Sequence, residues 1–219
     1  FMRRNVDFIP ELKDKNFTIK DEDDKKAIVT DCLKVLNIDA KPSWFMNAIS
    51  NFKNNLLFPE NIEVDWKNKD LVQIYKFYQE RLKVNNSCDF DDLLLFFWKM
   101  LKNYPQILDR FQEQFKYISV DEYQDTNFAQ HLIVTRLCEK HRRICVVGDD
   151  AQSIYSFRGA NIDNMLRFKD QYPDYRLFKL ERNYRSTQNI VNAANSLIRK
   201  NKGQIPKHVY SENEPGSKI

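Results

Sequence analysis

Glycine is scarce in this chain. Only four of the 219 residues are glycine, and the first of them is Gly148. A loop that wraps around a phosphate group needs glycines, because the backbone can approach the anion closely only where no side chain intervenes. A phosphate loop of the Gly-x-x-x-x-Gly-Lys type is therefore excluded from residues 1–147. Any nucleotide chemistry in this stretch has to come from residues of other kinds.

Metal-binding patterns and long apolar runs are also missing. The four cysteines, Cys32, Cys88, Cys138 and Cys145, are widely spaced without a Cys-x-x-Cys pair, which predicts buried, reduced thiols. The three histidines lack the spacing of a zinc site. No apolar run is long enough to span a membrane, and the first residues lack the apolar core of a signal peptide. These absences predict an intracellular protein without a membrane partner.

The composition is typical of a globular protein, with 42% hydrophobic and 30% charged residues. The length is sufficient for one large domain or two small ones. A net charge of +4 permits a nucleic-acid partner without indicating one. Residues 1–8 read as the tail of a helix already under way, and we interpret this as the start of a fragment.

The first half of the chain is predicted to be nearly all helical. Acids at residues 21–24 and Pro42 both suit a first helical turn, and apolar residues follow each of them at helical spacing. Helices are expected over about residues 21–36, 42–52, 67–84 and 105–114. A further helix is expected to be capped by Ser87 or Asp89, and its apolar stretch 93–98 predicts burial.

The second half changes to alternating strands and helices. Apolar strands are expected at 117–120, 144–148 and 175–180, with helices at 127–140 and 163–171 between them. The first two strands are expected to be buried. A last helix is expected from a Ser186 cap to about residue 200, with inward side chains Ile190, Val191, Ala194, Leu197 and Ile198. This alternation predicts an α/β fold with a parallel sheet and right-handed crossovers.

Acidic side chains follow two of these strands. Asp121, Glu122 and Asp125 come after the first, and Asp149 and Asp150 come after the second. Ligands bind beyond the carboxyl ends of the strands in open parallel sheets. Two adjacent carboxylates at that place suit a Mg²⁺ ion bound to phosphate, with the second acid free to polarise a water. An ordinary acidic turn after a strand remains the alternative.

Three polar clusters, at residues 121–125, 148–160 and 180–187, stand in an order and spacing that resembles a known family. They resemble motif II (Walker B), motif III and motif IV of the UvrD/PcrA/Rep type of superfamily 1 DNA helicases. The segments 88–93 and Arg3-Arg4 also resemble this family. The resemblance covers essentially the whole chain, and it implies a partial RecA-like parallel sheet preceded by a mostly helical insertion subdomain.

The resemblance implies a role for each polar residue. Asp121 would hold Mg²⁺ with Glu122 beside it, and Glu122 would orient and deprotonate the attacking water. Gln152 would touch the γ-phosphate or that water and report the nucleotide state. Arg185 would stabilise charge on the transferring phosphate, and Tyr184 would stack near the adenine of ATP. Without the resemblance, Arg185 reads as a surface residue at a helix start.

The resemblance also implies a single-strand DNA path along the motif III loop. Tyr155 and Phe157 would stack on bases and Arg158 would contact the DNA backbone. The family often has tryptophan where this chain has Phe157, a change that preserves stacking in weaker form. In isolation, Tyr155 and Phe157 would read as core aromatics.

Family members begin with an adenine-reading motif and a Walker A loop, and this chain has neither. The sequence therefore predicts an internal piece of a larger ATP-dependent helicase, itself inactive as an ATPase. Residues 1–103 would be the helical insertion of the first motor domain. Residues 104–184 would be the C-terminal half of the first RecA-like domain, and 185–219 the start of the second.

The parent protein would use ATP and Mg²⁺, and its partners would be single-stranded and duplex DNA and DNA repair proteins. A cytoplasmic, nucleoid-associated location follows from these partners. Two alternatives stay open. One is a stand-alone DNA-binding or regulatory module derived from a helicase. The other is a metal-dependent nuclease that uses Asp121, Glu122, Asp125 and Asp149.

Overall fold

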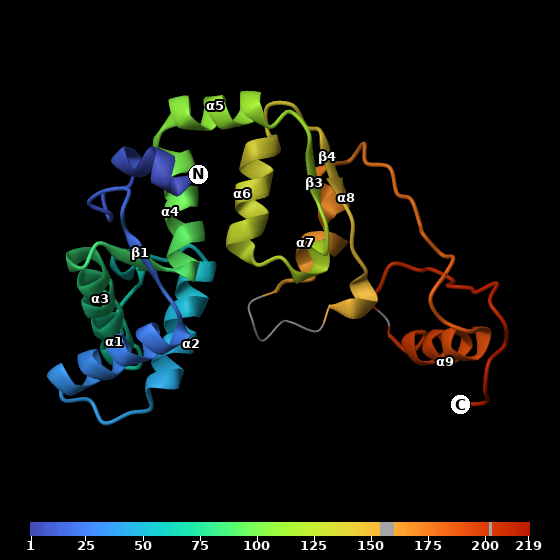
Figure 1. The fold of residues 1–219 in the computed structure, drawn as a ribbon, viewed down its shortest axis with the longest axis horizontal. Coiled ribbons are helices and arrows are strands. Elements are labelled where there is room, and N and C mark those ends of the chain that lie inside the picture. Colours follow the sequence, from blue (N-terminus) through green and yellow to red (C-terminus); the bar gives the residue numbers. More distant parts are fainter. Residues whose placement is uncertain (154–159, 202) are drawn as a thin grey trace. The chain divides into compact units, whose positions relative to one another are not determined.

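The computed structural model describes residues 1–153, 160–201 and 203–219 (Figure 1). The chain forms two compact units. The first comprises Phe1–Val120 and Thr126–Cys145, and the second comprises Asp121–Asp125 and Val146–Ile219. Among the described residues, no helix combines the length and the apolar character that crossing a membrane requires.

The first unit is mostly helical, as the sequence predicts. Its helices are α1 (Glu22–Val35), α2 (Pro42–Asn54), α3 (Lys69–Val84), α4 (Phe90–Asn103), α5 (Pro105–Gln114) and α6 (Phe128–Cys138), with 3₁₀-helices at Met2–Phe8 and Pro59–Asn61. Helices α1, α2 and α3 enclose one apolar cluster that includes Ile49, Ile74 and Tyr75. Helix α4 packs against α5 and α6 around a second cluster that includes Leu95 and Phe111.

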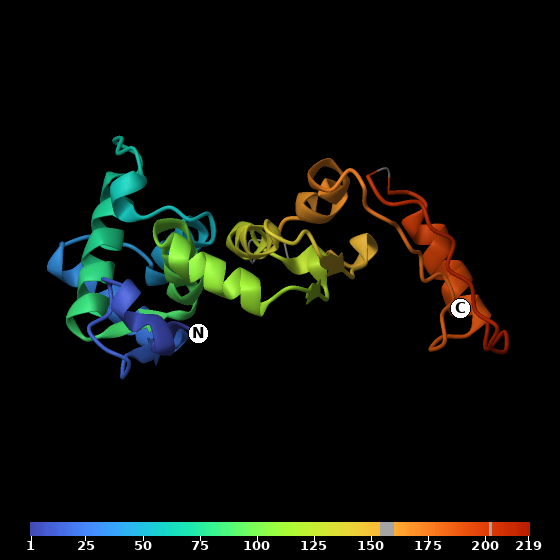
Figure 2. The same ribbon diagram turned by 90° about the horizontal axis from the view of Figure 1, so that it is seen from above.

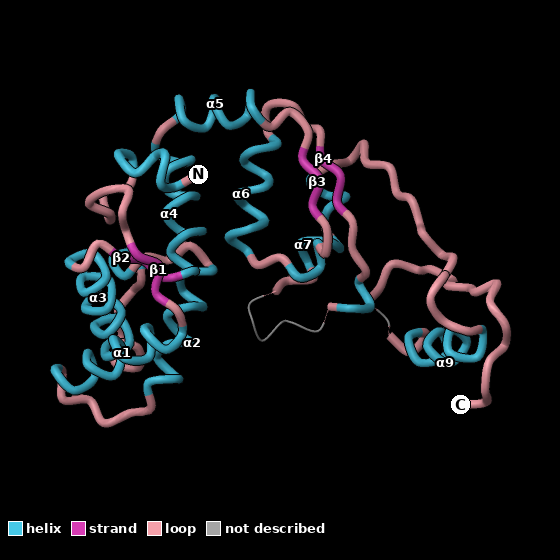
Figure 3. Tube along the Cα trace, viewed as in Figure 1, coloured by secondary structure: helices cyan, strands magenta, loops and turns pink. Residues whose placement is uncertain are grey.

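The helix starts follow the expected capping chemistry. The Asp21 carboxylate accepts a hydrogen bond from the Asp24 amide, and Pro42 occupies the first turn of α2. Asp89, rather than Ser87, caps α4, in a reciprocal capping box with Asp92. Ser87 instead lies in a short strand, β2 (Ser87–Asp89), which pairs in parallel with β1 (Thr18–Lys20) in a register that aligns Ile19 with Cys88 (Figure 3). The sequence pattern did not indicate this pair, because each strand is only three residues long.

A buried ionic group connects α2, α3 and α4. The Lys53 ammonium lies 2.6 Å from the Asp89 carboxylate and 2.8 Å from the Asp92 carboxylate, and all three side chains are at most 2% exposed. The Tyr78 hydroxyl also donates to Asp89, at 2.9 Å. Burial on its own lowers the pKa of Lys53, but the two carboxylates outweigh it and raise that pKa above its usual value. Lys53 is therefore charged, and its charge is compensated inside the protein.

A second set of polar contacts extends from this region to α6. Asp91 accepts hydrogen bonds from Lys25, Ser50 and Asn54. The Asn54 amide oxygen in turn accepts one, at 2.7 Å, from Asn127, the N-cap residue of α6. The acids at the start of α4 are thus helix-start residues, as the sequence predicts, and they also join three helices.

We expect substitution of Lys53 by methionine to destabilise the first unit by about 3–5 kcal/mol, because two buried carboxylates lose their counterion. Urea denaturation of the 219-residue chain, followed by circular dichroism, measures the loss. The matched control is Lys76→Met at an exposed lysine of α3, which should stay within about 0.5 kcal/mol. A loss below about 1 kcal/mol for Lys53→Met would contradict the assigned role.

Only two of the three predicted sheet strands form. Strands β3 (Ile118–Val120) and β4 (Ile144–Val146) are paired, and the flanking hydrogen bonds Ile118 N to Arg143 O and Tyr123 N to Val147 O advance in the same direction, as in a parallel pair. The prediction that these two strands are buried was wrong. Both strands are half-buried at alternate residues and exposed between them, because two strands leave most of each face uncovered.

The predicted strand at 175–180 is absent. Its residues form a loop that pairs with no strand among the described residues, and Leu177, Phe178 and Leu180 are exposed. Apolar β-branched and aromatic composition alone does not make a strand, because a ladder needs a neighbouring backbone. A single parallel bridge, Arg182 with Tyr210, forms just beyond this segment. The α/β class is confirmed, whereas the RecA-like sheet remains a prediction.

The second unit contains α7 (Asp163–Leu166), α8 (Phe168–Gln171) and α9 (Gln188–Ile198). After α9 the chain turns back along the helix (Figures 1 and 2). Asn195 and Gln188 donate to the carbonyl oxygens of Val209 and Ser211. The N-cap of α9 is Thr187, so the predicted Ser186 cap was wrong by one residue.

The predicted inward face of α9 was wrong for most of its members. Val191 alone of the five is buried, whereas Ile190, Ala194 and Leu197 are exposed and Ile198 is half-buried. The returning segment covers one narrow side of the helix, so it buries fewer residues than a packed sheet would.

The predicted burial of the thiols is confirmed for three of the four cysteines. All four cysteines are free, and Cys32, Cys88 and Cys138 are buried, whereas Cys145 is exposed. Burial raises the pKa of Cys88 to about 12 and the pKa values of Cys32 and Cys138 to about 11.

Candidate functional site

The segment Asp121–Asp125 leaves strand β3 through a tight turn. Asp121 accepts a hydrogen bond from the backbone amide of Glu122 at 2.9 Å, and Glu122 has a left-handed backbone with a φ of +50°. A left-handed conformation is unfavourable for a residue with a Cβ, by about 1–2 kcal/mol. A 3₁₀-helix, Tyr123–Asp125, follows at once. The turn leaves the carboxylates of Asp121 and Glu122 exposed at the end of the strand.

Gln124 is the buried member of this segment, with 1% of its surface exposed. Its amide nitrogen donates to the Glu122 carboxylate at 2.8 Å. Its amide oxygen accepts from the backbone N–H of Asp149 at 3.0 Å. One side chain thus joins the acidic turn after β3 to the segment after β4.

Gly148 makes room for this side chain. A Cβ atom built at Gly148 would lie 2.5 Å from the Gln124 amide oxygen and 3.3 Å from the Tyr123 backbone nitrogen. A side chain at this position would therefore displace the Gln124 amide, so the close approach of Gln124, rather than an unusual backbone angle, favours glycine here.

Asp149 organises the segment that follows. Its carboxylate accepts from the Ala151 amide at 3.0 Å and from the side-chain amide of Gln152 at 2.8 Å, which caps the 3₁₀-helix Asp150–Gln152. Lys207 forms ion pairs with Asp149 and Asp150, the latter at 2.6 Å. Burial raises the pKa of Asp149, but hydrogen bonds from Lys207 and Gln152 outweigh it and hold that pKa below its usual range.

Gln152 is therefore connected to Glu122 of motif II through two intermediate residues, Asp149 and Gln124. Its amide is bonded to Asp149, and Asp149 is connected through its backbone to Gln124 and so to Glu122. The sequence predicted site roles for Gln152, Asp121 and Glu122, but it did not predict the contacts that Gln124, Gly148 and Lys207 make here. Of these three residues, Gly148 could have been noticed from the sequence, because it is the first glycine of the chain and stands at the end of a predicted strand.

Tyr184 and Arg185 lie on an exposed turn. Asn183 accepts hydrogen bonds from the backbone amides of Arg185 and Ser186, and the guanidinium of Arg182 lies 4.8 Å from the centre of the Tyr184 ring. Tyr184 is 76% exposed. The Arg185 guanidinium makes no hydrogen bond or ion pair with any residue that the structure describes, so its predicted role at the phosphate stays a prediction. Tyr155, Phe157 and Arg158 lie outside the described residues.

No three or more His, Cys, Asp or Glu side chains in 1–153, 160–201 and 203–219 are gathered closely enough to hold a metal ion. The proposed metal-binding pair of Asp121 and Glu122 stays a prediction.

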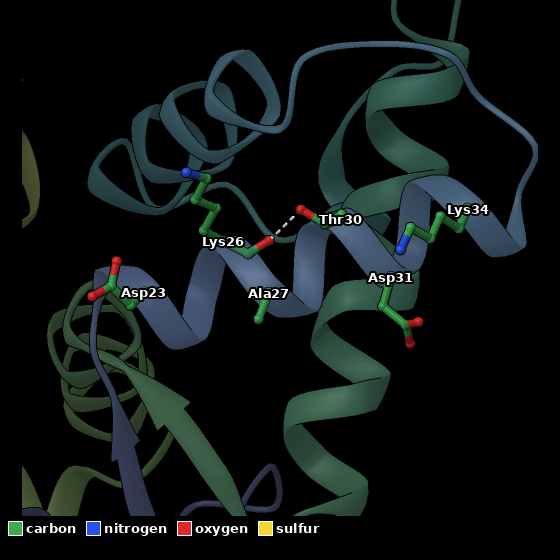
Figure 4. A pocket seen from close by; sticks show the side chains of 6 residues that line it. All are labelled: Asp23, Lys26, Ala27, Thr30, Asp31 and Lys34. Carbon is green, nitrogen blue, oxygen red and sulfur yellow. Dashed lines mark hydrogen bonds between the residues drawn. The ribbon is translucent and has the colours of Figure 1, made fainter.

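One surface depression of the first unit lies along α1 (Figure 4). Its lining residues all come from this helix: Asp23, Lys26, Ala27, Thr30, Asp31 and Lys34. The Thr30 hydroxyl donates to the Lys26 carbonyl oxygen, so it is satisfied within the helix. None of the candidate site residues lines this depression, and its alternating charges are those of a solvated helix face.

Comparison with known proteins decides the family. The family model described as the UvrD/REP helicase N-terminal domain matches residues 3–173, and the UvrD-like helicase C-terminal domain matches residues 178–219. The chain belongs to the UvrD/REP helicase family. It is 44% identical over 224 residues to the ATP-dependent DNA helicase PcrA of Staphylococcus epidermidis and 43% identical to that of Staphylococcus aureus. All of this chain is covered, but it spans only about 30% of the length of these relatives.

We expect Gly148→Ala to displace the Gln124 amide, because the added methyl group would lie too close to its oxygen. The Asp149 amide would then lose its acceptor, at a cost of about 1–3 kcal/mol in the free energy of unfolding. Urea denaturation checks this value. The control is Gly203→Ala, where a Cβ meets no atom within 4 Å and stability should stay equal or rise slightly. Equal effects of the two substitutions would contradict the close approach at Gly148.

Proposed function

We propose that this chain is part of an ATP-dependent DNA helicase that couples ATP hydrolysis to translocation on single-stranded DNA and to duplex unwinding, in DNA repair or replication. Membership of the UvrD/REP family supports the reaction class. The observation that carries the assignment to residues is the hydrogen-bonded connection from Glu122 through Gln124 to Asp149. It joins the two segments that such an enzyme needs for nucleotide hydrolysis.

Asp121 and Glu122 have the chemistry that a magnesium–nucleotide complex requires. Both carboxylates are exposed beyond the end of β3, and carboxylate oxygens are the donors that Mg²⁺ prefers. Asp121 would hold the ion, with Glu122 beside it, and the ion would neutralise charge on the phosphates of ATP. One oxygen of Asp121 already accepts the Glu122 amide, which fixes the carboxylate at the strand end.

Glu122 would act as the general base. One of its carboxylate oxygens, Oε2, is occupied by the Gln124 amide. The other oxygen would orient the attacking water and accept its proton. Gln152 would leave Asp149 to contact the γ-phosphate or the water, and this exchange of partners would report the nucleotide state. Arg185 would stabilise the phosphate charge, and Tyr184 would stack on the adenine.

The DNA side and the domain assignment complete the proposal. Tyr155, Phe157 and Arg158 would contact single-stranded DNA. We assign residues 1–103 to the helical insertion of the first motor domain, 104–184 to the C-terminal half of its RecA-like part, and 185–219 to the start of the second. The change from one family model to the other between residues 173 and 178 supports a boundary in this region. The parent would act on DNA in the cytoplasm, together with DNA repair proteins.

In the parent protein, we expect Glu122→Gln to lower kcat of single-strand-stimulated ATP hydrolysis by about 100-fold or more, because the amide cannot accept the proton of the water. A coupled ATPase assay measures the rate with and without DNA. Glu60→Gln, at an exposed glutamate of the first unit, is the control and should leave kcat unchanged. Undiminished turnover in Glu122→Gln would exclude Glu122 as the base.

The 219 residues on their own should not hydrolyse ATP, because they contain no Gly-x-x-x-x-Gly-Lys loop to hold the phosphates. Release of inorganic phosphate by the purified chain, with Mg²⁺ and single-stranded DNA present, should equal that of its Glu122→Gln form. DNA-stimulated release that Glu122→Gln abolishes would refute this expectation.

A further inference from the structure

We propose that Gln124 is a positioning residue: it fixes the carboxylate of Glu122 and transmits its position to the Asp149–Gln152 segment. The inference rests on the proposed function, because it needs Glu122 as the base. It adds a residue that touches neither the nucleotide nor the DNA and that acts through its neighbours.

The hydrogen bonds define the orientation of the Gln124 amide. Glu122 offers an acceptor and the Asp149 backbone offers a donor, so the amide nitrogen must face the first and the oxygen the second. The side chain is 1% exposed, so water does not compete for these two bonds. No other natural side chain of this length presents a donor and an acceptor at the same two places.

Glu122 needs such a partner more than a buried glutamate would. Its side chain is exposed and its backbone is left-handed, so packing alone does not select one rotamer. The bond from Gln124 holds one carboxylate oxygen, and the other oxygen would then serve the substrate water. A base displaced by about 1 Å loses as much as 100-fold in rate.

The same amide couples motif II to motif III. The backbone N–H of Asp149 donates to the Gln124 amide oxygen. The Asp149 carboxylate accepts from Gln152 and forms an ion pair with Lys207. A shift of Glu122 when a nucleotide binds would therefore move the Asp149 backbone, and with it the group that retains Gln152. Gly148 permits this contact because it carries no Cβ. Gly148 thus leaves space for the buried amide of Gln124, and the next residue, Asp149, donates a hydrogen bond to it.

The test uses the parent protein with Gln124→Met, which removes both hydrogen bonds, and Gln124→Glu, which keeps an acceptor for Asp149 but places a carboxylate against Glu122. We expect kcat of DNA-stimulated ATP hydrolysis to fall by about 10- to 100-fold in both, with KM for ATP within about twofold. Gln112→Met is the matched control. Gln112 is also buried and donates one hydrogen bond, to the Arg136 carbonyl oxygen, so kcat should stay within about twofold.

A double variant separates positioning from general damage to the fold. If Gln124 acts through Glu122, Gln124→Met adds less than about threefold to the loss caused by Glu122→Gln alone. Losses that multiply in the double variant would overturn the proposal. Gly148→Ala gives an independent test, because it displaces the side-chain amide of Gln124 without replacing that residue. It should lower kcat in the same way.

The outcomes distinguish the two hypotheses. Full activity in Glu122→Gln would refute the proposed function of Glu122. An inactive Glu122→Gln together with wild-type kcat in Gln124→Glu and Gly148→Ala would leave that function intact and would refute the role of Gln124. Should Gln124→Met not fold, these two substitutions decide the question by themselves.

Discussion

The buried amide of Gln124 holds together two segments that lie 25 residues apart in the sequence, the acidic turn after β3 and the capped turn after β4. Each segment is short, and in each of them exposed residues such as Glu122 and Gln152 stand beside buried ones such as Gln124 and Asp150. A hydrogen bond in a buried place is costly to lose, because the partner left behind is not solvated. The contact that holds the candidate base, the preference for glycine at 148 and the hydrogen bond of the Asp149 backbone all involve this one side chain.

A different interaction organises the helical unit. Lys53, Asp89 and Asp92 bring ionisable groups into the interior, where a charge is expensive unless it is paired and hydrogen-bonded. The reciprocal cap of α4 uses the same two carboxylates that bind Lys53. The start of α4 and the end of α2 are therefore fixed relative to each other. The contact between Asn54 and Asn127 extends this order to the N-cap residue of α6, two positions after Asp125 in the sequence.

The sequence predicts well what local chemistry determines. The helix starts at Asp21 and Pro42 follow from capping and from the fixed φ of proline, and both are present. The strands β3 and β4 were found from their apolar runs, but their burial was overestimated. The prediction of a strand at 175–180 was wrong, because a strand forms only beside a partner strand, which a local pattern does not reveal. The inward face of α9 was predicted wrongly for the same reason, because its burial also depends on a packing partner that the local pattern does not reveal.

The features that the sequence did not predict depend on contacts between residues that are far apart in the chain. Nothing in the local pattern shows that Lys53 is buried, because its partner Asp89 lies 36 residues away. Asp121, Glu122 and Gln152 were recognisable because their family motifs are contiguous in the sequence. Gln124 stands in the same motif as Glu122, yet its role depends on Asp149, which only the fold brings to it.

The most direct test of this account is a crystal structure of the parent protein with a non-hydrolysable ATP analogue, Mg²⁺ and single-stranded DNA. The account predicts Asp121 at the ion and one Glu122 oxygen at the water beside the γ-phosphate. It also predicts that the Gln124 amide still bridges Glu122 and the Asp149 backbone within hydrogen-bonding distance. A structure in which Glu122 contacts that water while the Gln124 amide is bonded to neither partner would contradict it.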